Sequence, residues 1–300
     1  MSLEHLVKSF TFERLLESNT QTKHIALLGS INSQPAIIRL ERAHYNLDAI
    51  STLTSATIQD IINTGSNDIY QWGLGTTAST LPDNADVKIN IIYPATETHI
   101  NKYSHQEYHV VSETPEMYQK YVVPFIETQI GDRLQWVRNI LFEGAEAERV
   151  VYRDEAEDGF VLVPDMKWDG INVDQLYLTA IVNRGTQIKS VRDLNIGHAE
   201  WLKAMALKIR TVVVEKYQDI KPDQLRLFVH YHPSYYHLHI HCVIVSHPGL
   251  GDGIGAGKAI LLEEVIDQLQ WLGEEGFKKK TMTYTLGENH KLWMILKDHI

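Results

Sequence analysis

The densest group of reactive side chains in this sequence is a row of histidines near residue 240. Six of the 15 histidines lie between residues 230 and 247, and three of these alternate with other residues: His237, His239 and His241. Two apolar runs flank a Pro233–Ser234 pair, a pattern that predicts a strand, a turn and a second strand. Because side chains alternate between the two faces of a strand, we expect the three imidazoles on one face. The other face would carry the apolar set Leu238, Ile240, Cys242 and Ile244.

A metal site is one chemistry that such a row could serve. Imidazole nitrogens bind zinc at about 2.0–2.1 Å. However, His237 and His241 would be attached about 13 Å apart on a strand that rises about 3.3 Å per residue, so one ion could bind two of the three rings but hardly all. No cluster of Cys, Asp or Glu follows nearby in the sequence to complete the ligand set. Chemically silent surface histidines are the other simple interpretation, and strict alternation above an apolar face argues against it.

Phosphoryl transfer fits the row better. A neutral imidazole is nucleophilic near pH 7, and its neighbours can donate hydrogen bonds to phosphoryl oxygens or protonate the leaving group. An elongated anion with several phosphorus centres would match a row of three rings. The pattern therefore predicts covalent phosphoryl or nucleotidyl transfer, with the central histidine as the nucleophile.

The elements that must position this row divide the chain into two parts. Residues 1–97 are predicted to form a mostly β domain, and residues 106–300 an α+β domain in which strands and helices are segregated. The polar segment 98–105 between them has a helical pattern without a strong apolar face, which is typical of a hinge. In the first domain we expect a short helix at 9–18 and strands at 24–28, 36–40, 69–72 and 87–93. In the second we expect helices near 116–128, 134–141, 198–217 and 259–271, and strands at 150–153, 160–163, 225–231 and 237–245.

Composition excludes several classes of function. The 300 residues include 28 Lys and Arg against 38 Asp and Glu, a formal net charge of -10, so the chain lacks the basic surface that long duplex nucleic acid requires. At 44% hydrophobic and 22% charged residues the composition is that of a globular protein. No apolar run approaches the roughly 20 residues that span a bilayer, so we expect no membrane partner. The first residues show no secretory signal and Cys242 is the only cysteine, so we expect a reducing compartment, the cytoplasm or the nucleus.

The residues around the row resemble a known family. The run His237–Val243 matches the His-φ-His-φ-His-φ-φ motif of the histidine-triad (HIT) superfamily, where φ is apolar. The segments 86–97, 134–141, 158–168 and 230–236 resemble the scavenger mRNA decapping enzymes of that superfamily, so the likeness covers most of the chain. The resemblance implies a HIT-like α+β catalytic domain with an antiparallel sheet and helices. It also implies a smaller, mostly β N-terminal domain that is swapped between the subunits of a homodimer.

A reaction is implied as well. The enzymes of this family hydrolyse 7-methylguanosine-capped dinucleotides and short capped oligonucleotides to 7-methyl-GMP and a nucleoside diphosphate or a 5′-diphosphate oligonucleotide, without a metal or other cofactor. By position in the motif, His239 would form a nucleotidyl-histidine intermediate, and His237 and His241 would orient it and contact phosphate. The other phosphate-binding residues that the resemblance implies are His230, Ser234, Tyr235, Lys102 and Lys258.

The remaining implied residues hold the cap. Trp136 would stack on the 7-methylguanine, whose positive charge adds cation–π attraction, and Met166 would cover the opposite face. Glu146 would accept hydrogen bonds from the guanine edge. The rest of the implied pocket is Pro164, Asp165 and Lys167. Without the resemblance, Trp136 would fit a helix core and Glu146 an acidic surface helix, and Trp168 would be a second candidate for stacking.

Two other functions are compatible with the sequence. Another HIT branch, such as a dinucleoside polyphosphate hydrolase, shares the motif, but the N-terminal module and the chain length argue against it. A catalytically weak, cap-binding regulatory paralogue would not need all three histidines of the motif. The glycine-rich loop 249–258 is not a Walker phosphate loop, because Asp252 and Ala259 occupy positions that require Gly and Ser or Thr.

Overall fold

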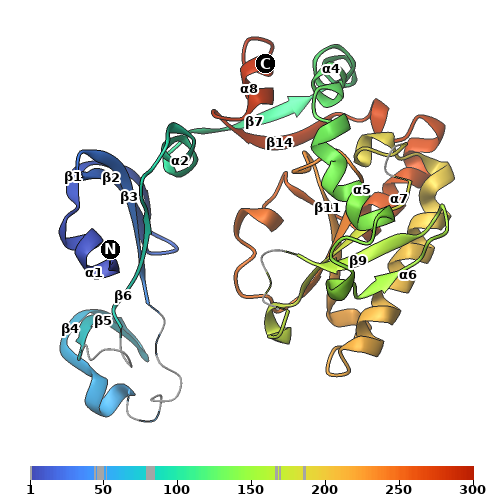
Figure 1. The fold of residues 1–300 in the computed structure, drawn as a ribbon. Coiled ribbons are helices and arrows are strands. Elements are labelled where there is room, and N and C mark those ends of the chain that lie inside the picture. The colour runs from blue at the N-terminus through green and yellow to red at the C-terminus, as the bar shows by residue number, and fades with distance from the viewer. Residues whose placement is uncertain are drawn as a thin grey trace. The chain divides into compact units, whose positions relative to one another are not determined.

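The chain folds into two compact units, an N-terminal unit of residues 1–106 and a C-terminal unit of residues 107–300 (Figure 1). The computed structural model describes residues 2–43, 45, 51, 53–78, 85–165, 168, 170–184 and 187–300. The segment predicted to be a hinge, 98–105, lies in the N-terminal unit, and helix α2 (Glu97–Tyr103) covers most of it. In the described part of the chain, no helix is both long enough and apolar enough to cross a membrane.

An antiparallel four-stranded sheet forms the centre of the N-terminal unit. Its strands follow in the order β1 (Thr11–Asn19), β2 (His24–Ile31), β3 (Gln34–Arg42) and β6 (Val87–Ile92). The turn between β2 and β3 consists of Asn32 and Ser33, both at positive φ, which is the turn geometry that matches the twist of paired strands. Helix α1 (Leu3–Lys8) precedes the sheet, and Ile100 of α2 is buried with Leu16 and Leu28 of the sheet.

The predicted helix at 9–18 is wrong, because this segment forms β1. The register of β1 against β2 shifts between Phe12 and Arg14, and again between Leu15 and Glu17. Each shift interrupts the two-residue alternation of a strand, so the apolar residues take a spacing that imitates a helix. Only Leu16 of β1 is buried, so pairing with β2 determines this strand more than its own pattern does.

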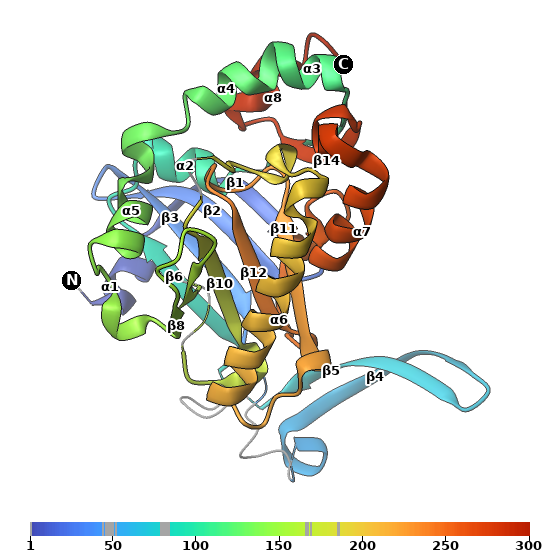
Figure 2. The same cartoon turned by 90° about the vertical axis from the view of Figure 1, so that its right-hand side faces the viewer.

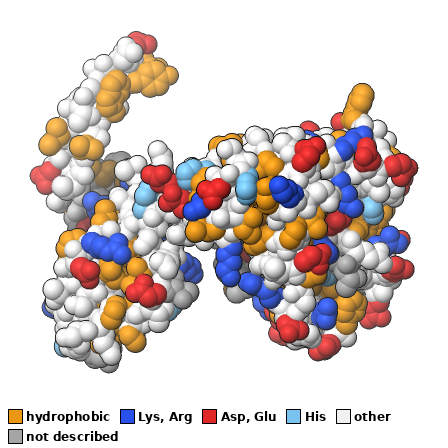
Figure 3. Space-filling model, turned by 90° about the horizontal axis from the view of Figure 1, so that it is seen from above, with side chains coloured by type: hydrophobic (Ala, Val, Ile, Leu, Met, Phe, Trp, Pro, Cys, Tyr) orange, Lys and Arg blue, Asp and Glu red, His pale blue; other side chains and the backbone are white. Residues whose placement is uncertain are grey.

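A separate hairpin completes the N-terminal unit. Strands β4 (Ile58–Asn67) and β5 (Tyr70–Thr77) pair only with each other among the described strands, after a π-helical turn at Leu53–Thr57 (Figure 2). The hairpin exposes many apolar side chains, which Figure 3 shows in orange along an arm of the molecule. The large exposed ones are Ile61, Ile62, Ile69, Tyr70, Trp72 and Leu74.

Two antiparallel sheets form the C-terminal unit. The larger sheet has six strands in the order β13 (Ala259–Leu261), β11 (Leu225–His230), β12 (His239–Ile244), β10 (Tyr177–Val182), β9 (Phe160–Pro164) and β8 (Tyr152–Arg153). The smaller sheet pairs β7 (Tyr108–Glu113) with β14 (Met282–Gly287). Strands and helices are segregated along the chain, so the expected α+β class with antiparallel sheets is confirmed.

Helices pack around the two sheets of this unit. The first helical stretch, residues 115–127, comprises α3 (Pro115–Met117), a π-helical turn (Tyr118–Val122) and α4 (Val123–Glu127). The others are α5 (Gln135–Phe142), α6 (Ala199–Lys216), α7 (Leu262–Leu272) and α8 (Lys291–Leu296). Leu202, Met205, Ile209 and Val213 of α6 recur at helical spacing and are buried, so α6 lies along one face of the sheet (Figure 2).

The register of the larger sheet separates an apolar face from the face that carries the histidines. Residues opposite each other on neighbouring strands share a face. Ile240 of β12 pairs with Ala180, and both belong to the core that α6 covers. His239 pairs with Ile181, which packs with Val137 of α5 in a second core. Helix α5, which also carries Trp136, therefore lies on the same face as the ring of His239.

Candidate active site

His239, the central residue of the row, is a neutral imidazole, and one of its ring nitrogens carries a lone pair that accepts no hydrogen bond from the described residues. It begins β12 and is only 3% exposed. Burial lowers the pKa of His239 to about 4, so the ring is neutral at pH 7. Its Nδ1 lies 2.8 Å from the carbonyl oxygen of His237, and because a carbonyl can only accept, Nδ1 carries the proton. The lone pair is therefore on Nε2, which has no hydrogen-bond partner among the described residues.

His237 does not extend from the strand as predicted. Because β12 begins at His239, His237 lies in the bend that leads into the strand, and the alternating pattern could not show where pairing starts. Burial lowers the pKa of His237, and its Nε2 donates a hydrogen bond of 2.7 Å to the carbonyl oxygen of Val182. His237 thus acts on His239 through its own backbone carbonyl, which fixes the tautomer of the reactive ring.

Two further imidazoles continue the group, His241 on the same strand β12 and His230 on the neighbouring strand β11. The ring of His241 lies 4.9 Å from that of His239 and 4.2 Å from that of His230 on β11. Nδ1 of His241 is 3.1 Å from the hydroxyl of Tyr177, and Nε2 of His230 donates to the carbonyl oxygen of Gly253 at 2.7 Å. The structure therefore brings His230, His239 and His241 together as a ring cluster.

A cavity of about 670 Å³ opens beside this cluster. This volume is within the range of small-molecule sites. Five residues predicted from the sequence line it: Asp165, His230, Ser234, His241 and Lys258. Residues that sequence reasoning missed also line it, including Tyr108 and Thr285, which come from β7 and β14. Long-range strand pairing brings these two residues to the cavity, and no local motif marks them.

Ser234 and Lys258 supply polar groups beside the imidazoles. Ser234 lies at the exposed tip of the turn between β11 and β12. The ammonium of Lys258 donates to the carbonyl oxygen of His232 in the same turn. A hydroxyl, an ammonium and several imidazoles around one cavity are groups that bind the oxygens of a phosphate chain.

Aromatic contacts connect this centre to the predicted cap side. Tyr235 stacks on His239, with ring centroids 4.1 Å apart and an interplanar angle of 15°. Trp136 meets Tyr235 edge to face, with centroids 4.8 Å apart, and 45% of Trp136 is exposed. An exposed indole one ring away from the nucleophile can stack on a base whose phosphate reaches His239. Trp168, the second candidate for stacking, is instead buried, and its indole nitrogen donates to the carbonyl oxygen of Asn172.

Glu146 lies in a polar group near the end of β9. It forms an ion pair of 2.6 Å with Arg149, whose other terminal nitrogen is 3.5 Å from the carbonyl oxygen of Pro164. Asp165 accepts a hydrogen bond of 3.2 Å from the hydroxyl of Thr179 on β10. Glu146 and Pro164 are thus connected through Arg149, which was not predicted, and Asp165 faces the cavity.

Comparison with known proteins assigns this arrangement to a family. The model described as "Scavenger mRNA decapping enzyme (DcpS) N-terminal" matches residues 5–106, and that described as "Scavenger mRNA decapping enzyme C-term binding" matches residues 135–257. The chain belongs to the scavenger mRNA decapping enzyme family.

Curated relatives of the scavenger decapping family align along nearly the whole chain. A Schizosaccharomyces pombe protein is 43% identical over 296 residues, which cover 97% of this chain and 95% of the relative. Relatives from Sus scrofa and Homo sapiens are 36% and 33% identical, and each alignment covers 96% of this chain and 85% of the relative. All three are named m7GpppX diphosphatase.

Three residues that the scavenger decapping family implied are not placed in this group. Lys102 belongs to α2 of the N-terminal unit, where its ammonium lies 5.3 Å from the ring centroid of Tyr103. Met166 and Lys167 lie outside the described residues. Their assignments stay predictions.

A buried charge network under the β11–β12 turn is the largest feature that sequence reasoning missed. Glu113 is fully buried and accepts from the guanidinium of Arg192, from the hydroxyl of Tyr231 at 2.6 Å and from that of Tyr284 at 2.6 Å. Nε2 of His232 lies 3.1 Å from the same carboxylate. Burial alone would raise the pKa of Glu113, but the hydrogen bond from His232 and the charge of Arg192 lower it to about 2. The network anchors Tyr231 and His232, the first residues of the turn that carries Ser234 and Tyr235.

Proposed function

We propose that this protein hydrolyses 7-methylguanosine-capped dinucleotides and short capped oligonucleotides, releasing 7-methyl-GMP and a nucleoside diphosphate or a 5′-diphosphate oligonucleotide. Membership of the scavenger decapping family and relatives named m7GpppX diphosphatase support this substrate. One structural observation carries the chemistry: Nε2 of His239 bears a lone pair, and the neighbouring ring of His241 lines a cavity with other groups that bind phosphate.

The reaction would proceed in two displacements at one phosphorus atom. Nε2 of His239 attacks the phosphorus attached to 7-methylguanosine, a P–N bond forms, and the P–O bond to the next phosphate breaks. The electron pair leaves with the nucleoside diphosphate. The ring gains positive charge in this step, and the hydrogen bond from Nδ1 to the carbonyl of His237 stabilises that charge. Water then attacks the same phosphorus and loses a proton to the solvent. The P–N bond breaks, its electron pair returns to Nε2, and 7-methyl-GMP departs from a neutral His239.

Cap recognition would rest on Trp136. Its exposed indole, held edge to face by Tyr235, offers a face to the cationic 7-methylguanine, for which stacking and cation–π attraction add. Glu146 would accept from the guanine edge after exchanging its contact with Arg149. Met166, Lys167 and Lys102 complete the proposed binding set by family resemblance.

A competition among dinucleotides tests the substrate. The purified protein is incubated with m7GpppG, GpppG and ApppA at equal concentrations, and products are identified by mass. We expect cleavage of m7GpppG well ahead of the uncapped pair, and 7-methyl-GMP as a product. Equal or preferred cleavage of ApppA would favour a general dinucleoside polyphosphate hydrolase. Tight binding of m7GpppG without any cleavage would favour a regulatory cap-binding protein.

We also propose that the protein is a homodimer with swapped N-terminal domains. A two-stranded hairpin is marginal by itself, and β4 and β5 expose a set of large apolar side chains that includes Ile62 and Trp72. Light scattering after size exclusion should give twice the chain mass, and the double variant Ile62→Ser with Trp72→Ser should shift it toward the monomer. A monomeric mass for the unaltered chain would overturn the proposal.

The cytoplasm or the nucleus is the proposed location. Cys242, the only cysteine, is buried and free, as expected in a reducing compartment. Imaging of the tagged chain in its own cells tests this proposal, and accumulation in a secretory compartment would contradict it.

A further inference from the structure

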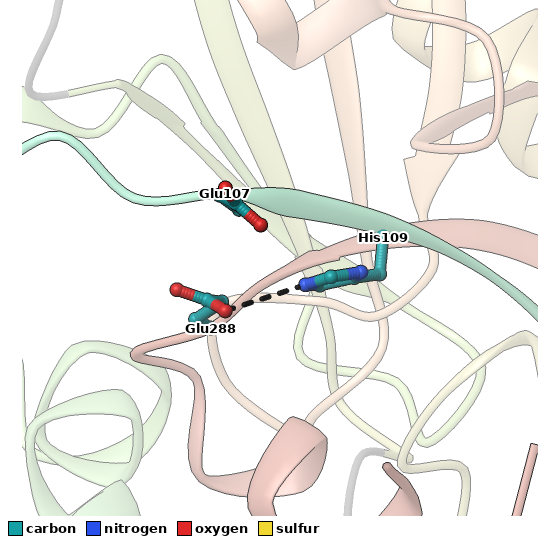
Figure 4. Close-up of side chains that lie close together, drawn as sticks. All are labelled: Glu107, His109 and Glu288. Carbon is teal, nitrogen blue, oxygen red and sulfur yellow. Dashed lines mark ion pairs between the residues drawn. The ribbon is translucent and has the colours of Figure 1, made fainter.

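Three potential ligand side chains meet on one face of the smaller sheet, at the end where β7 begins and β14 ends (Figure 4). Glu107 and His109 are two residues apart, so they point to the same face of the extended chain. The register that pairs Leu286 with His109 and Gly287 with Tyr108 continues to Glu288, whose amide donates to the carbonyl oxygen of Glu107 at 3.0 Å. Backbone pairing therefore holds all three on one face.

The distances among these side chains suit a shared cation. One ligand atom from each residue lies within 4.8 Å of the others, and Nε2 of His109 is 3.6 Å from Oε1 of Glu288. Zinc–ligand bonds of about 2.0–2.2 Å place tetrahedral ligand atoms about 3.4 Å apart, so the second distance already fits. The other separations are at most 4.8 Å, and rotation of a carboxylate inward can close any remaining gap. Glu107 and Glu288 are both exposed and can do so.

The ring of His109 is held in place by packing, but its Nε2 has no hydrogen-bond partner among the described residues. His109 stacks on Trp293 of α8, with ring centroids 3.9 Å apart and an interplanar angle of 2°. Its Nε2 is shielded from solvent and has no hydrogen-bond partner among the described residues, because the carboxylate of Glu288 is too distant for a hydrogen bond. The ring thus directs an unused nitrogen at two carboxylates.

The two carboxylates oppose each other across the strand pair. Like charges directly opposite on neighbouring strands destabilise a sheet. A divalent cation between Glu107 and Glu288 would offset this repulsion.

We propose that Glu107, His109 and Glu288 form a zinc site on the smaller sheet. One nitrogen and two oxygens are ligands that zinc accepts, while an imidazole is a poor ligand for magnesium or calcium. Three protein ligands leave the fourth tetrahedral position to water. The side chain of Tyr108, between two of the ligands, points to the opposite face of β7, and Tyr108 lines the cavity described above. The ion would therefore fix the strand without entering the catalytic cavity.

Zinc titration of the full chain, after treatment with EDTA and its removal, tests the site by calorimetry and thermal unfolding. The variant Glu288→Gln removes one ligand at an exposed position, and His109→Gln removes the nitrogen. The matched control is Glu274→Gln, which removes an exposed carboxylate elsewhere in the same unit. The catalytic imidazoles are intact in all three variants, so any zinc that they bind is common to every sample.

We expect the unaltered chain and Glu274→Gln to bind one zinc ion that Glu288→Gln and His109→Gln bind at least tenfold more weakly. Zinc should raise the melting temperatures of the unaltered chain and Glu274→Gln more than those of Glu288→Gln and His109→Gln. Glu288→Gln should unfold like the unaltered chain in EDTA, which shows that the variant is folded. Zinc binding of the same stoichiometry and affinity in all four proteins would overturn the proposal, as would no binding to the unaltered chain.

Discussion

The tautomer of His239 decides which of its nitrogens can attack phosphorus. The carbonyl of His237 accepts a hydrogen bond from Nδ1–H of His239, and burial keeps the ring neutral, so the nucleophile needs no separate base to activate it. The backbone carbonyl of His237 therefore determines which nitrogen of His239 is reactive. The motif predicts the central ring as the nucleophile but not the contacts of the three rings, and the structure gives each a different hydrogen-bond partner: His237 contacts Val182, and His241 contacts Tyr177.

A titration of the ring checks this assignment. The pKa of His239 is lowered to about 4 by burial, so its nitrogen chemical shifts should stay those of a neutral Nδ1–H imidazole from pH 8 down to about pH 5. An exposed residue such as His5 is the internal comparison in the same spectra. Titration of His239 near pH 6.5, or shifts typical of Nε2–H, would contradict the account.

The stacking role of Trp136 predicts a binding defect. Trp136→Ala should raise KM for m7GpppG by roughly five- to a hundredfold, because stacking on a base contributes about 1–3 kcal/mol. Trp136→Phe should recover part of the loss. Trp271→Ala is the matched control, because that indole is 82% exposed on α7. A KM for Trp136→Ala equal to that of the control would remove Trp136 from the cap site.

Elements were predictable where their own pattern determines them. Helix α6 follows the predicted 198–217 because its buried residues recur at helical spacing, and β9 follows the predicted 160–163 because it is an apolar run. Strand β1 was not predictable, because bulges interrupt the alternation of its side chains. The pairing of β7 with β14 was not predictable either. Glu113 and Tyr284 are 171 residues apart, and neither strand has a local pattern that indicates its partner.

The network around Glu113 ties several of these elements together. Glu113 ends β7, and Arg192 lies in a short helical turn at Val191–Asp193. Tyr231 and His232 begin the turn after β11, and Tyr284 lies on β14. Removal of one partner from a buried ion pair leaves an uncompensated charge. Because the same carboxylate holds the catalytic turn, its loss should also disturb Ser234 and Tyr235.

Glu113→Gln should therefore lower the free energy of unfolding by about 3–5 kcal/mol, since the charge of Arg192 loses its counter-ion inside the fold. Urea unfolding at pH 7 measures this change. Glu215→Gln on the exposed side of α6 is the matched control and should change stability by less than about 0.5 kcal/mol. Equal stability of the two variants would show that the network contributes little.

The net charge of the whole molecule bears on the binding of long nucleic acid but not on that of a short polyphosphate. A net charge of -10 argues against long nucleic acid, but a short polyphosphate needs only local groups, and His230, Ser234 and Lys258 provide them around one cavity. Family membership was predictable from the motif with its flanking segments. The cavity itself was not, because residues from β7, β11, β12 and β14 meet there only in the folded chain.

Buried neutral histidines also make the stability of the whole fold depend on pH. The pKa of His239 is about 4 in the folded chain and about 6.5 in an unfolded one, and burial lowers the pKa values of His232 and His237 as well. Between these values the unfolded chain binds more protons, so stability decreases as pH falls through this window. From pH 7 to pH 5, His239 alone should reduce the free energy of unfolding by about 2 kcal/mol.

Urea unfolding at the two pH values measures this loss, and His239→Asn is the control that should lose less stability over the same interval. Glu113 contributes little to this loss, because both its ordinary pKa of 4.5 and its lowered pKa of about 2 in the folded chain lie below pH 5. A free energy of unfolding that is constant or rises from pH 7 to pH 5 would contradict a buried neutral His239.

Hydrolysis of m7GpppG by the unaltered chain and by His239→Asn, with products identified by mass, tests the central claim most directly. The unaltered chain should release 7-methyl-GMP and GDP, and should do so equally in EDTA, since the proposed zinc site lies outside the reaction. His239→Asn should still bind the cap analogue but lose at least about a thousandfold in kcat, because no nucleophile remains to form the P–N bond. Normal turnover by His239→Asn, or no 7-methyl-GMP from the unaltered chain, would contradict the account.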